Sequence, residues 1–266
     1  MKIQTLQHKD LELIAELQPE DWPDIRNAIS FYTSSDFCVP IKVVIENKIV
    51  GIGAGIIHKD IAWLAHIIVH PEYRNKGLGR LITQTLVDRA YAKNCHTIYL
   101  IATDLGAPVY EKVGFITETE YIFFKDIHWN QKFELAENII AYTNEFKTQI
   151  AHLDNEISGE NRMFHIEPHL NGAYVYMQEN TIQGFYLPSF GEGIIVANKS
   201  LAGIELMKLR FTTSEIAAFP VENLSATEFM YQNNFKEYRT AKRMRLRTKR
   251  AWQAKNIYNR IGGNLG

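Results

Sequence analysis

Charged residues and glycines gather in one short stretch of the sequence, Arg74 to Arg80. The stretch reads Arg-Asn-Lys-Gly-Leu-Gly-Arg, so Gly77 and Gly79 are separated by a single residue. Glycines at the start of a helix let a ligand approach the backbone, and the N–H groups there are unpaired and carry partial positive charge. Together with the three cationic side chains, this arrangement predicts a site for a phosphate or pyrophosphate group.

Two common phosphate-binding loops do not fit these residues. A Walker loop needs Gly-Lys-Ser or Gly-Lys-Thr, whereas Gly79 is followed by Arg80 and Leu81. A dinucleotide fingerprint needs a third glycine, and Ile82 stands at its position. The glycine pair also comes well after the preceding strand instead of directly at its end.

A buried strand and an amphipathic helix flank the glycine pair. Residues 61–70 are almost all apolar, which predicts a strand covered on both faces. After a polar turn at 71–76, apolar residues recur at steps of three and four from Gly77 onwards, which predicts a helix with one buried face. The apolar positions are Leu78, Leu81, Ile82, Leu86 and Ala90.

The stretch from Val69 to Gly79 resembles the acetyl-CoA motif of the GNAT (GCN5-related) N-acetyltransferases, which is Arg/Gln-x-x-Gly-x-Gly/Ala after a strand ending Val-x-Pro. In that family, backbone N–H groups of the motif hold the CoA pyrophosphate. The preceding strand splays from its neighbour and pairs with the pantetheine arm. The resemblance therefore implies acetyl-CoA as a cosubstrate. The cofactor-binding residues that it implies are Ile67, Ile68, Val69, Arg74, Asn75, Lys76, Gly77, Leu78, Gly79, Arg80 and Thr103.

A second stretch, Tyr110 to Phe115, reads Tyr-Glu-Lys-Val-Gly-Phe and resembles a late helix of the same family. The tyrosine there often lies near the CoA sulfur, so the resemblance implies that Tyr110 protonates the departing thiolate as a general acid. A packing role on a short helix is the alternative. Many members carry Asn seven residues earlier, where this chain has Thr103, so the pantetheine contact of Thr103 is open. Ile98 stands where some members have Glu, so no general base is assigned.

Four side chains are candidates for the missing base, which must deprotonate an amine with a pKa of about 10. They are His66, His70, Glu72 and Asp21. Each of them is also explained by a structural or solvated role. A backbone N–H of the 67–69 strand segment is expected to stabilise the charge that develops on the thioester oxygen.

The N-terminal residues are expected to form two helices, at about 6–17 and 21–32, where the family binds its acceptor. Trp22, Phe31 and Tyr32 are candidates for the acceptor pocket, and packing of these helices on the sheet is the favoured alternative. Strands are expected at 41–46, 49–57, 96–102 and 115–125, with a turn at Asn47-Lys48. Glycines at alternate positions of the second strand leave one face open for a helix or a ligand. They are Gly51, Gly53 and Gly55.

From about residue 132 the same order of elements begins again in a weaker form. A helix is expected at 133–153 and another at 200–209, with strands at 173–178, 182–187, 193–197 and 215–220. Ala197-Asn198-Lys199-Ser200 replaces the glycine motif, and Met230 stands opposite Tyr110, so the chemistry is lost while the scaffold remains.

The fold prediction is α/β (α+β), with two tandem acyl-CoA N-acyltransferase (GNAT) folds whose mixed, mostly antiparallel sheets are flanked by helices. The chain resembles a tandem subgroup in which residues 1–130 form a catalytic, acetyl-CoA-binding domain. Residues 131–266 would form a degenerate GNAT-like domain, which is not expected to bind CoA in the usual way.

Composition narrows the class of protein further. The 266 residues are 46% hydrophobic and 22% charged, which is typical of a globular domain, and the net charge of −1 favours neither nucleic acid nor an anionic membrane. The basic run Arg239 to Arg250 alternates with apolar residues, so a half-exposed strand is preferred to a nucleic-acid patch. Cys38 and Cys95 have no metal-site spacing, and no metal is expected. No signal peptide or spanning segment is found, so a cytoplasmic location is expected.

The sequence thus predicts an N-acetyltransferase (EC 2.3.1.-) that moves an acetyl group from acetyl-CoA to a primary amine by direct attack. The acceptor is expected to be a small molecule or a peptide. The alternative is a non-catalytic acyl-CoA-binding or regulatory protein, in which the CoA loop survives without an acceptor site. The acceptor and the oligomeric state stay open.

Overall fold

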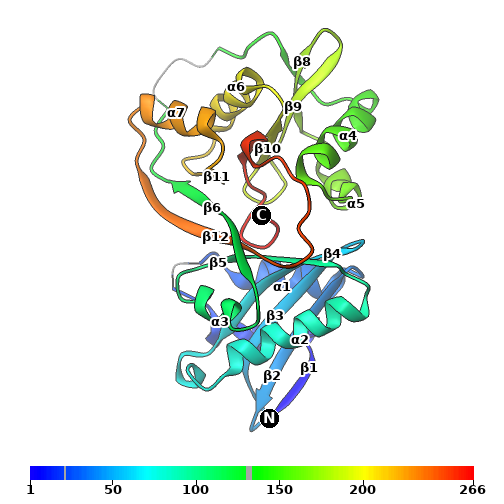
Figure 1. The fold of residues 1–266 in the computed structure, drawn as a ribbon, viewed down its shortest axis with the longest axis vertical. Coiled ribbons are helices and arrows are strands. Elements are labelled where there is room, and N and C mark those ends of the chain that lie inside the picture. Colours follow the sequence, from blue (N-terminus) through cyan, green and yellow to red (C-terminus); the bar gives the residue numbers. More distant parts are fainter. Residues whose placement is uncertain (21, 130–133) are drawn as a thin grey trace. The chain divides into compact units, whose positions relative to one another are not determined.

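A computed structural model describes residues 1–20, 22–129 and 134–266, which form two compact units (Figure 1). Unit 1 contains Met1–Thr117, Met244–Lys249 and Gly263–Leu265. Unit 2 contains Glu118–Arg243, Arg250–Gly262 and Gly266. The units are therefore not simple halves of the sequence. The domain boundary expected after residue 130 lies outside the described residues, and a functional division into 1–130 and 131–266 stays a prediction.

Unit 1 is built on a mixed, mostly antiparallel sheet. Its strands are β1 (Lys2–Thr5), β2 (Cys38–Ile45), β3 (Lys48–His58), β4 (Ile61–Val69) and β5 (Thr97–Ala102), in that spatial order. The first four are antiparallel to their neighbours, whereas β4 and β5 are parallel. This sheet confirms the predicted fold class.

The strand beside β5 comes from far along the sequence. It is β12 (Glu237–Arg247), of which Met244–Arg247 belong to unit 1. The hydroxyl of Thr97 donates to the carbonyl oxygen of Thr248 (2.9 Å), and the N–H of Thr248 donates to the carbonyl oxygen of His96 (3.3 Å). The basic run 239–250 is thus largely a strand, as predicted. β6 (Ile116–Phe124) begins in unit 1 and continues into unit 2.

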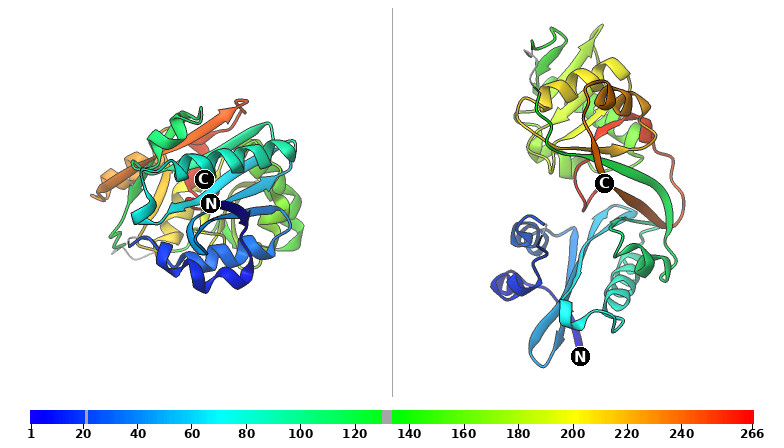
Figure 2. Two further views of the ribbon diagram at one scale, coloured as in Figure 1. Left: turned by 90° about the horizontal axis from the view of Figure 1, so that it is seen from below. Right: turned by 90° about the vertical axis from the view of Figure 1, so that its left-hand side faces the viewer.

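Helices cover both faces of the unit 1 sheet (Figure 2). The 3₁₀ helices η1 (His8–Asp10) and η2 (Glu12–Leu17) and the helix α1 (Ile25–Ser34) lie on one face, and α2 (Leu78–Ala92) lies on the other. The short elements η3 (Pro71–Tyr73) and α3 (Ala107–Glu111) flank α2 in the sequence.

Three local predictions in this region were wrong in detail. The helix expected at 6–17 is a pair of 3₁₀ helices, preceded by the unpredicted β1. The helix expected from residue 21 begins at Ile25, because the side chain of Asp24 accepts a hydrogen bond from the N–H of Arg26 (2.9 Å) and caps the helix. Asp21 itself lies outside the described residues. The hairpin turn is centred on Glu46 and Asn47, which both have positive φ.

Two glycines of β3 allow α2 to lie close to the sheet. A Cβ atom at Gly53 would stand 2.7 Å from Cγ2 of Ile82 and 3.0 Å from Cδ1 of Leu86, and one at Gly51 would stand 2.9 Å from Cδ1 of Ile82. The glycine face of this strand therefore accommodates a helix, one of the two occupants that the alternation predicted.

Replacing Gly53 by Ala is expected to lower the free energy of unfolding by about 1–3 kcal/mol, because the added methyl group overpacks a stiff, β-branched Ile82. Gly55→Ala is the matched control in the same strand, since its Cβ would find its nearest atoms at 3.9 Å and 4.0 Å. Thermal unfolding of both variants measures the difference. Equal melting temperatures would contradict this account of the packing.

Unit 2 repeats the order of elements found in unit 1. Its five-stranded sheet has the order β13-β10-β9-β8-β7, and β11 pairs with β6. The series β8-β9-β10-α6-β11-α7 corresponds to β2-β3-β4-α2-β5-α3. The bounds are β7 (Ile139–Ala141), β8 (Tyr174–Gln178), β9 (Thr181–Leu187), β10 (Ile194–Ala197), β11 (Ala217–Pro220), β13 (Ile257–Asn259), α4 (Lys147–Ser158), α5 (Met163–Ile166), α6 (Ser200–Arg210) and α7 (Leu224–Gln232). Three further 3₁₀ helices are η4 (Asn144–Phe146), η5 (Glu167–His169) and η6 (Ala254–Asn256).

The helix expected at 133–153 was wrong over most of its length. The helix α4 begins only at Lys147, and Ile139–Ala141 forms the strand β7. Pairing with β8, which joins Ile139 to Tyr176, overrides the weak helical periodicity of this segment.

Within the described ranges, no helix is both long and apolar enough to cross a bilayer. Cys95 is buried and Cys38 half-buried, and both are free thiols.

Candidate acetyl-CoA and acceptor site

The strands β4 and β5 pair only over their first residues. Their parallel register joins Ile61 to Thr97 and ends where Trp63 faces Tyr99. Beyond this point the two strands continue to Val69 and Ala102 without pairing to each other. Residues 67–69 of β4 lie in this region, where β4 has no pairing with β5. These unpaired strand ends form the kind of opening in which members of the GNAT family bind the pantetheine arm.

A β-bulge lies in β4 within this unpaired region. Ile52 of β3 faces Ile68, and Ala54 faces Ala65, so the single residue Gly53 is opposite two residues, His66 and Ile67. His66 has a φ of +48°, a left-handed conformation that is uncommon for residues other than glycine. Bulges of this kind redirect a side chain and leave backbone groups unpaired.

The glycine motif forms the start of α2, as predicted. Gly77 is the N-cap residue with a φ of +80°, and no side chain caps the helix. The first helical hydrogen bond runs from the N–H of Leu81 to the carbonyl oxygen of Gly77 (3.0 Å), which leaves the N–H groups of residues 78–80 without an acceptor in the helix. A Cβ atom at Gly77 would have nothing within 4 Å, so open space faces this turn.

Cationic side chains surround this helix start. Arg74, Lys76 and Arg80 are exposed. The Nε of Arg74 donates to the carbonyl oxygen of Val69 (3.2 Å), and the ammonium of Lys76 lies 5.1 Å from the centre of the Tyr73 ring. Arg74 thus joins the end of β4 to the loop. The arrangement fits a pyrophosphate, because unpaired N–H groups and full positive charges occur together.

Tyr110 lies on α3, which packs beside the first turn of α2. A Cβ atom at Gly79 would stand 3.6 Å from Cγ1 of Val109, the residue before Tyr110. The Tyr110 ring packs closely on Gly106, where a Cβ would stand 2.8 Å from the ring. Burial raises the pKa of Tyr110 to about 12. The phenol is therefore protonated at neutral pH, which is the state that a general acid requires.

Thr103 closes the turn before α3. Its Oγ1 accepts a hydrogen bond from the N–H of Gly106 (3.3 Å), and its carbonyl oxygen accepts from the N–H groups of Gly106 and Ala107. The residue is exposed, and its hydroxyl proton remains available for a further bond. Its contact with the pantetheine arm stays a prediction.

The region of unit 1 where an acceptor is expected brings together residues from three separate segments. The hydroxyl of Tyr32, which is buried on α1, lies 3.0 Å from Nδ1 of His66. The Nδ2 of Asn264 donates to the Tyr32 oxygen (3.0 Å). Trp22 meets the His66 ring edge to face, with centroids 5.7 Å apart. Burial lowers the pKa of His66 to about 4, so the ring is neutral at pH 7.

Sequence reasoning found three members of this cluster and missed Asn264. Tyr32 and Trp22 were acceptor-pocket candidates, and His66 was a candidate base. Phe31, the remaining pocket candidate, is part-exposed and meets the Tyr32 ring edge to face at 5.9 Å. No local pattern around residue 264 indicates a partner in α1, because the contact joins residues 232 positions apart.

The other base candidates lie in the turn after β4. The Nδ1 of His70 accepts a hydrogen bond from the N–H of Glu72 (3.3 Å), and Nε2 of His70 lies 3.9 Å from a carboxylate oxygen of Glu16. The side chain of Glu72 is exposed. These contacts assign His70 a capping role in η3. The fourth candidate, Asp21, is not among the described residues.

In unit 2 the corresponding opening is filled by the chain itself. The strand β13 pairs with β10. Asn259 and Arg260 also bond to Ala218 of β11. The N–H of Arg260 donates to the carbonyl oxygen of Ala218 (2.8 Å). The Oδ1 of Asn259 accepts from the Ala218 N–H (3.1 Å). The strand β13 therefore lies between the equivalents of β4 and β5, where a pantetheine arm would need to enter.

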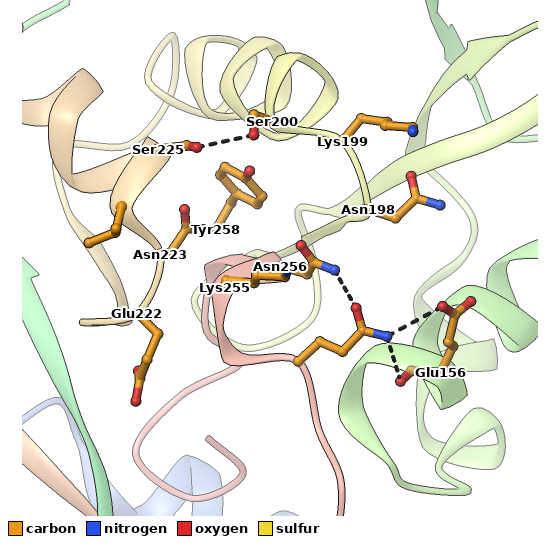
Figure 3. Close-up of a pocket in the computed structure, with 12 residues that line it drawn as sticks. Glu156, Asn198, Lys199, Ser200, Glu222, Asn223, Ser225, Lys255, Asn256 and Tyr258 are labelled. Carbon is orange, nitrogen blue, oxygen red and sulfur yellow. Dashed lines mark hydrogen bonds between the residues drawn. The ribbon is translucent and has the colours of Figure 1, made fainter.

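A polar pocket of about 470 Å³ remains beside β13 in unit 2 (Figure 3). The hydroxyl of Ser225 at the start of α7 donates to that of Ser200 at the start of α6 (3.0 Å). Tyr258 of β13 packs so tightly on α6 that a Cβ at Gly203 would stand 2.4 Å from its ring. The lining residues are Glu156, Asn198, Lys199, Ser200, Glu222, Asn223, Leu224, Ser225, Gln253, Lys255, Asn256 and Tyr258.

The unpaired end of β4 and the uncapped glycine turn are two features that the resemblance to the acetyltransferases predicts. Residues 4–115 match the model of the Acetyltransferase (GNAT) family. Two curated relatives are glucosamine 6-phosphate N-acetyltransferases. The one from Trypanosoma brucei brucei is 30% identical over 57 residues, which are 21% of this chain and 39% of that protein. The one from Schizosaccharomyces pombe is 33% identical over 51 residues, which are 19% of this chain and 46% of that protein. The chain thus spans less than half the length of these relatives.

Solved structures extend the similarity of fold to the whole chain. A Pyrococcus horikoshii protein has a TM-score of 0.83 at 19% identity, covering 100% of this chain and 95% of that chain. A tandem GNAT protein from the clavulanic acid biosynthesis pathway has a TM-score of 0.61 at 13% identity, covering 92% of this chain and 98% of that chain. A GCN5-related N-acetyltransferase from Sphaerobacter thermophilus has a TM-score of 0.64 at 13% identity, covering 92% and 95%. The predicted family and the tandem GNAT fold are both confirmed.

Proposed function

We propose that unit 1 transfers an acetyl group from acetyl-CoA to a primary amine. The observation that carries this proposal is the uncapped first turn of α2, which follows the unpaired end of β4. N–H groups at residues 78–80 and the charges of Arg74, Lys76 and Arg80 suit the pyrophosphate. The unpaired edge of β4 suits the amide groups of the pantetheine arm.

The residues of this site support a direct attack by the amine. The neutral amine forms the new C–N bond at the thioester carbonyl, and the C–S bond breaks. A backbone N–H near the bulge, at residues 67–69, donates to the oxygen on which negative charge develops. Tyr110 gives its hydroxyl proton to the departing thiolate and recovers a proton afterwards. The proton lost by the amine passes to solvent, directly or through a base that this proposal leaves unassigned.

The proposed acceptor is a primary amine on a small molecule or a peptide. The relatives named above act on glucosamine 6-phosphate by their names, which supports a small amine in general. The match covers only a minor part of each of them, so it does not carry their substrate to this chain. A cytoplasmic location stays a prediction from the sequence.

Release of free thiol from acetyl-CoA, measured with a panel of amines, tests the proposal. Small amines, amino acids, polyamines, amino sugars and peptides belong in the panel. Amine-dependent thiol release is expected for at least one class. Tight acetyl-CoA binding without turnover across the whole panel would favour the alternative, a non-catalytic acyl-CoA-binding protein.

Calorimetric titration is expected to give one acetyl-CoA bound per chain. The second opening holds β13, and the Asn198-Lys199-Ser200 turn lacks the two glycines of unit 1. A stoichiometry of two would contradict the degenerate role of unit 2. The matched control is Gly79→Trp, which changes only the site in unit 1 and should leave no binding.

A further inference from the structure

We propose that Asn264, acting through the hydroxyl of Tyr32, fixes His66 in the Nε2–H tautomer. His66 then serves as a hydrogen-bond donor to an oxygen atom of the amine substrate and not as the general base. The inference deepens the proposed function, on which its substrate part rests. All three residues belong to unit 1, although Asn264 is reached only after the chain has passed through unit 2.

The direction of each hydrogen bond follows from the donors available. The Nδ2 of Asn264 donates to the Tyr32 oxygen at 3.0 Å. A tyrosine hydroxyl has one proton, and the remaining neighbour of this oxygen is Nδ1 of His66, also at 3.0 Å. Tyr32 therefore donates its proton to Nδ1. A neutral imidazole that accepts at Nδ1 carries its proton on Nε2.

The surroundings hold this arrangement in place. Tyr32 is 1% exposed, so its hydroxyl has no water to exchange partners with. The His66 backbone is fixed in the bulge with positive φ, and the Trp22 ring contacts the imidazole from the side. Burial keeps the ring neutral, because it lowers the pKa of His66 to about 4.

The remaining nitrogen of His66 is available to a ligand. Nε2 makes no hydrogen bond to the described residues, and it is not among the enclosed polar atoms that lack a partner. His66 belongs to the bulge next to the unpaired edge of β4, where the thioester is proposed to lie. A neutral N–H at this place binds oxygen acceptors such as hydroxyl, carboxylate or phosphate groups. The geometry thus points to amines that carry such an oxygen near the amino group.

Nitrogen NMR of the free protein labelled with ¹⁵N-histidine tests the tautomer directly. Long-range proton–nitrogen correlations distinguish a protonated from an unprotonated ring nitrogen, and the His66 signals are assigned by their loss in His66→Gln. In the wild type at pH 8, Nε2 is expected to be protonated and Nδ1 unprotonated. The opposite tautomer, or an equal mixture, would overturn the proposal.

The variant Asn264→Asp is expected to reverse the tautomer. A carboxylate only accepts, so Tyr32 would donate to Asp and its oxygen would accept from Nδ1–H, which leaves Nε2 unprotonated. Asn94→Asp introduces the same charge elsewhere in unit 1 and should leave the His66 signals unchanged. Tyr32→Phe removes the link and should abolish the preference for one tautomer. Unchanged His66 signals in both Asn264→Asp and Tyr32→Phe would refute the relay.

Kinetics then test the substrate part of the proposal. With the amine found in the panel, Asn264→Asp is expected to raise the KM for the amine about tenfold while the KM for acetyl-CoA stays the same, since a misdirected hydrogen bond costs on the order of 1.4 kcal/mol. An unchanged KM for the amine would limit Asn264 to a structural role. Because the NMR readout needs no turnover, a failure of the relay is distinguished from a failure of the proposed activity.

Discussion

Replacing Gly79 by Trp is expected to abolish the rise in melting temperature that acetyl-CoA causes. A Cβ at residue 79 would stand 3.6 Å from Cγ1 of Val109, an ordinary contact, so the variant is expected to fold. The indole would extend from the turn that is proposed to bind the pyrophosphate, and it is expected to take the ligand's place there. At 100 times its dissociation constant, a ligand stabilises the binding state by about 2.7 kcal/mol, which is roughly 5–10 °C for a domain of this size. Thermal unfolding with acetyl-CoA, CoA, ATP and NAD measures the effect.

The matched control is Gln84→Trp, which places the same side chain on the exposed part of α2. This variant should keep the full response to acetyl-CoA. Both variants should unfold at similar temperatures without ligand, which separates loss of binding from loss of fold. A normal acetyl-CoA response in Gly79→Trp would exclude the glycine turn as the cofactor site.

Replacing Tyr110 by Phe is expected to lower kcat by about 10²-fold or more, the usual contribution of a general acid. The aromatic ring and its packing on Gly106 would remain, so the KM for acetyl-CoA should change little. Since burial raises the pKa of Tyr110 to about 12, the Tyr110 hydroxyl of the wild type stays protonated throughout pH 7–10. Deprotonation of Tyr110 should therefore cause no fall in kcat within that range.

Tyr91→Phe provides the control for this experiment. Tyr91 is also a half-buried tyrosine of unit 1, but it lies in the last turn of α2, where the Arg247 guanidinium stands 4.0 Å from the centre of its ring. Loss of this hydroxyl should leave kcat unchanged. If Tyr110→Phe retained full activity as well, the thiolate would have to be protonated by water, and Tyr110 would be a packing residue.

Much of unit 1 could be predicted because its signals are local. The glycine turn, the apolar strand before it and the periodicity of α2 occupy one continuous stretch, and each was found where it was expected. The alternating glycines of β3 likewise predicted a close neighbour on one face of the strand. These features depend on backbone geometry and side-chain period, which a sequence displays directly.

What escaped prediction depends on contacts between distant segments. Asp24 caps α1 through a bond to the N–H of Arg26, and the sequence analysis did not single it out, because such a bond is seen only in the folded chain. The strand β13 has three residues and no turn signal that sets it between β10 and β11. Asn264 meets Tyr32 because the chain returns to unit 1 after leaving unit 2. The glycine turn and the strand before it were therefore predicted from the sequence, whereas the contacts among Tyr32, His66 and Asn264 were predicted only in part.

The position of Met244–Arg247 beside β5 also affects the order in which the parts of the protein can fold. A ribosome must synthesise most of the chain before this segment emerges, so the sheet of unit 1 stays incomplete while unit 2 is being made. Until then β5 presents an open edge, which is the kind of surface on which chains associate wrongly. A gene shortened after the first copy would lose this strand as well as the second copy. Selection for correct folding can thus preserve a second copy that lacks the glycine motif of the first.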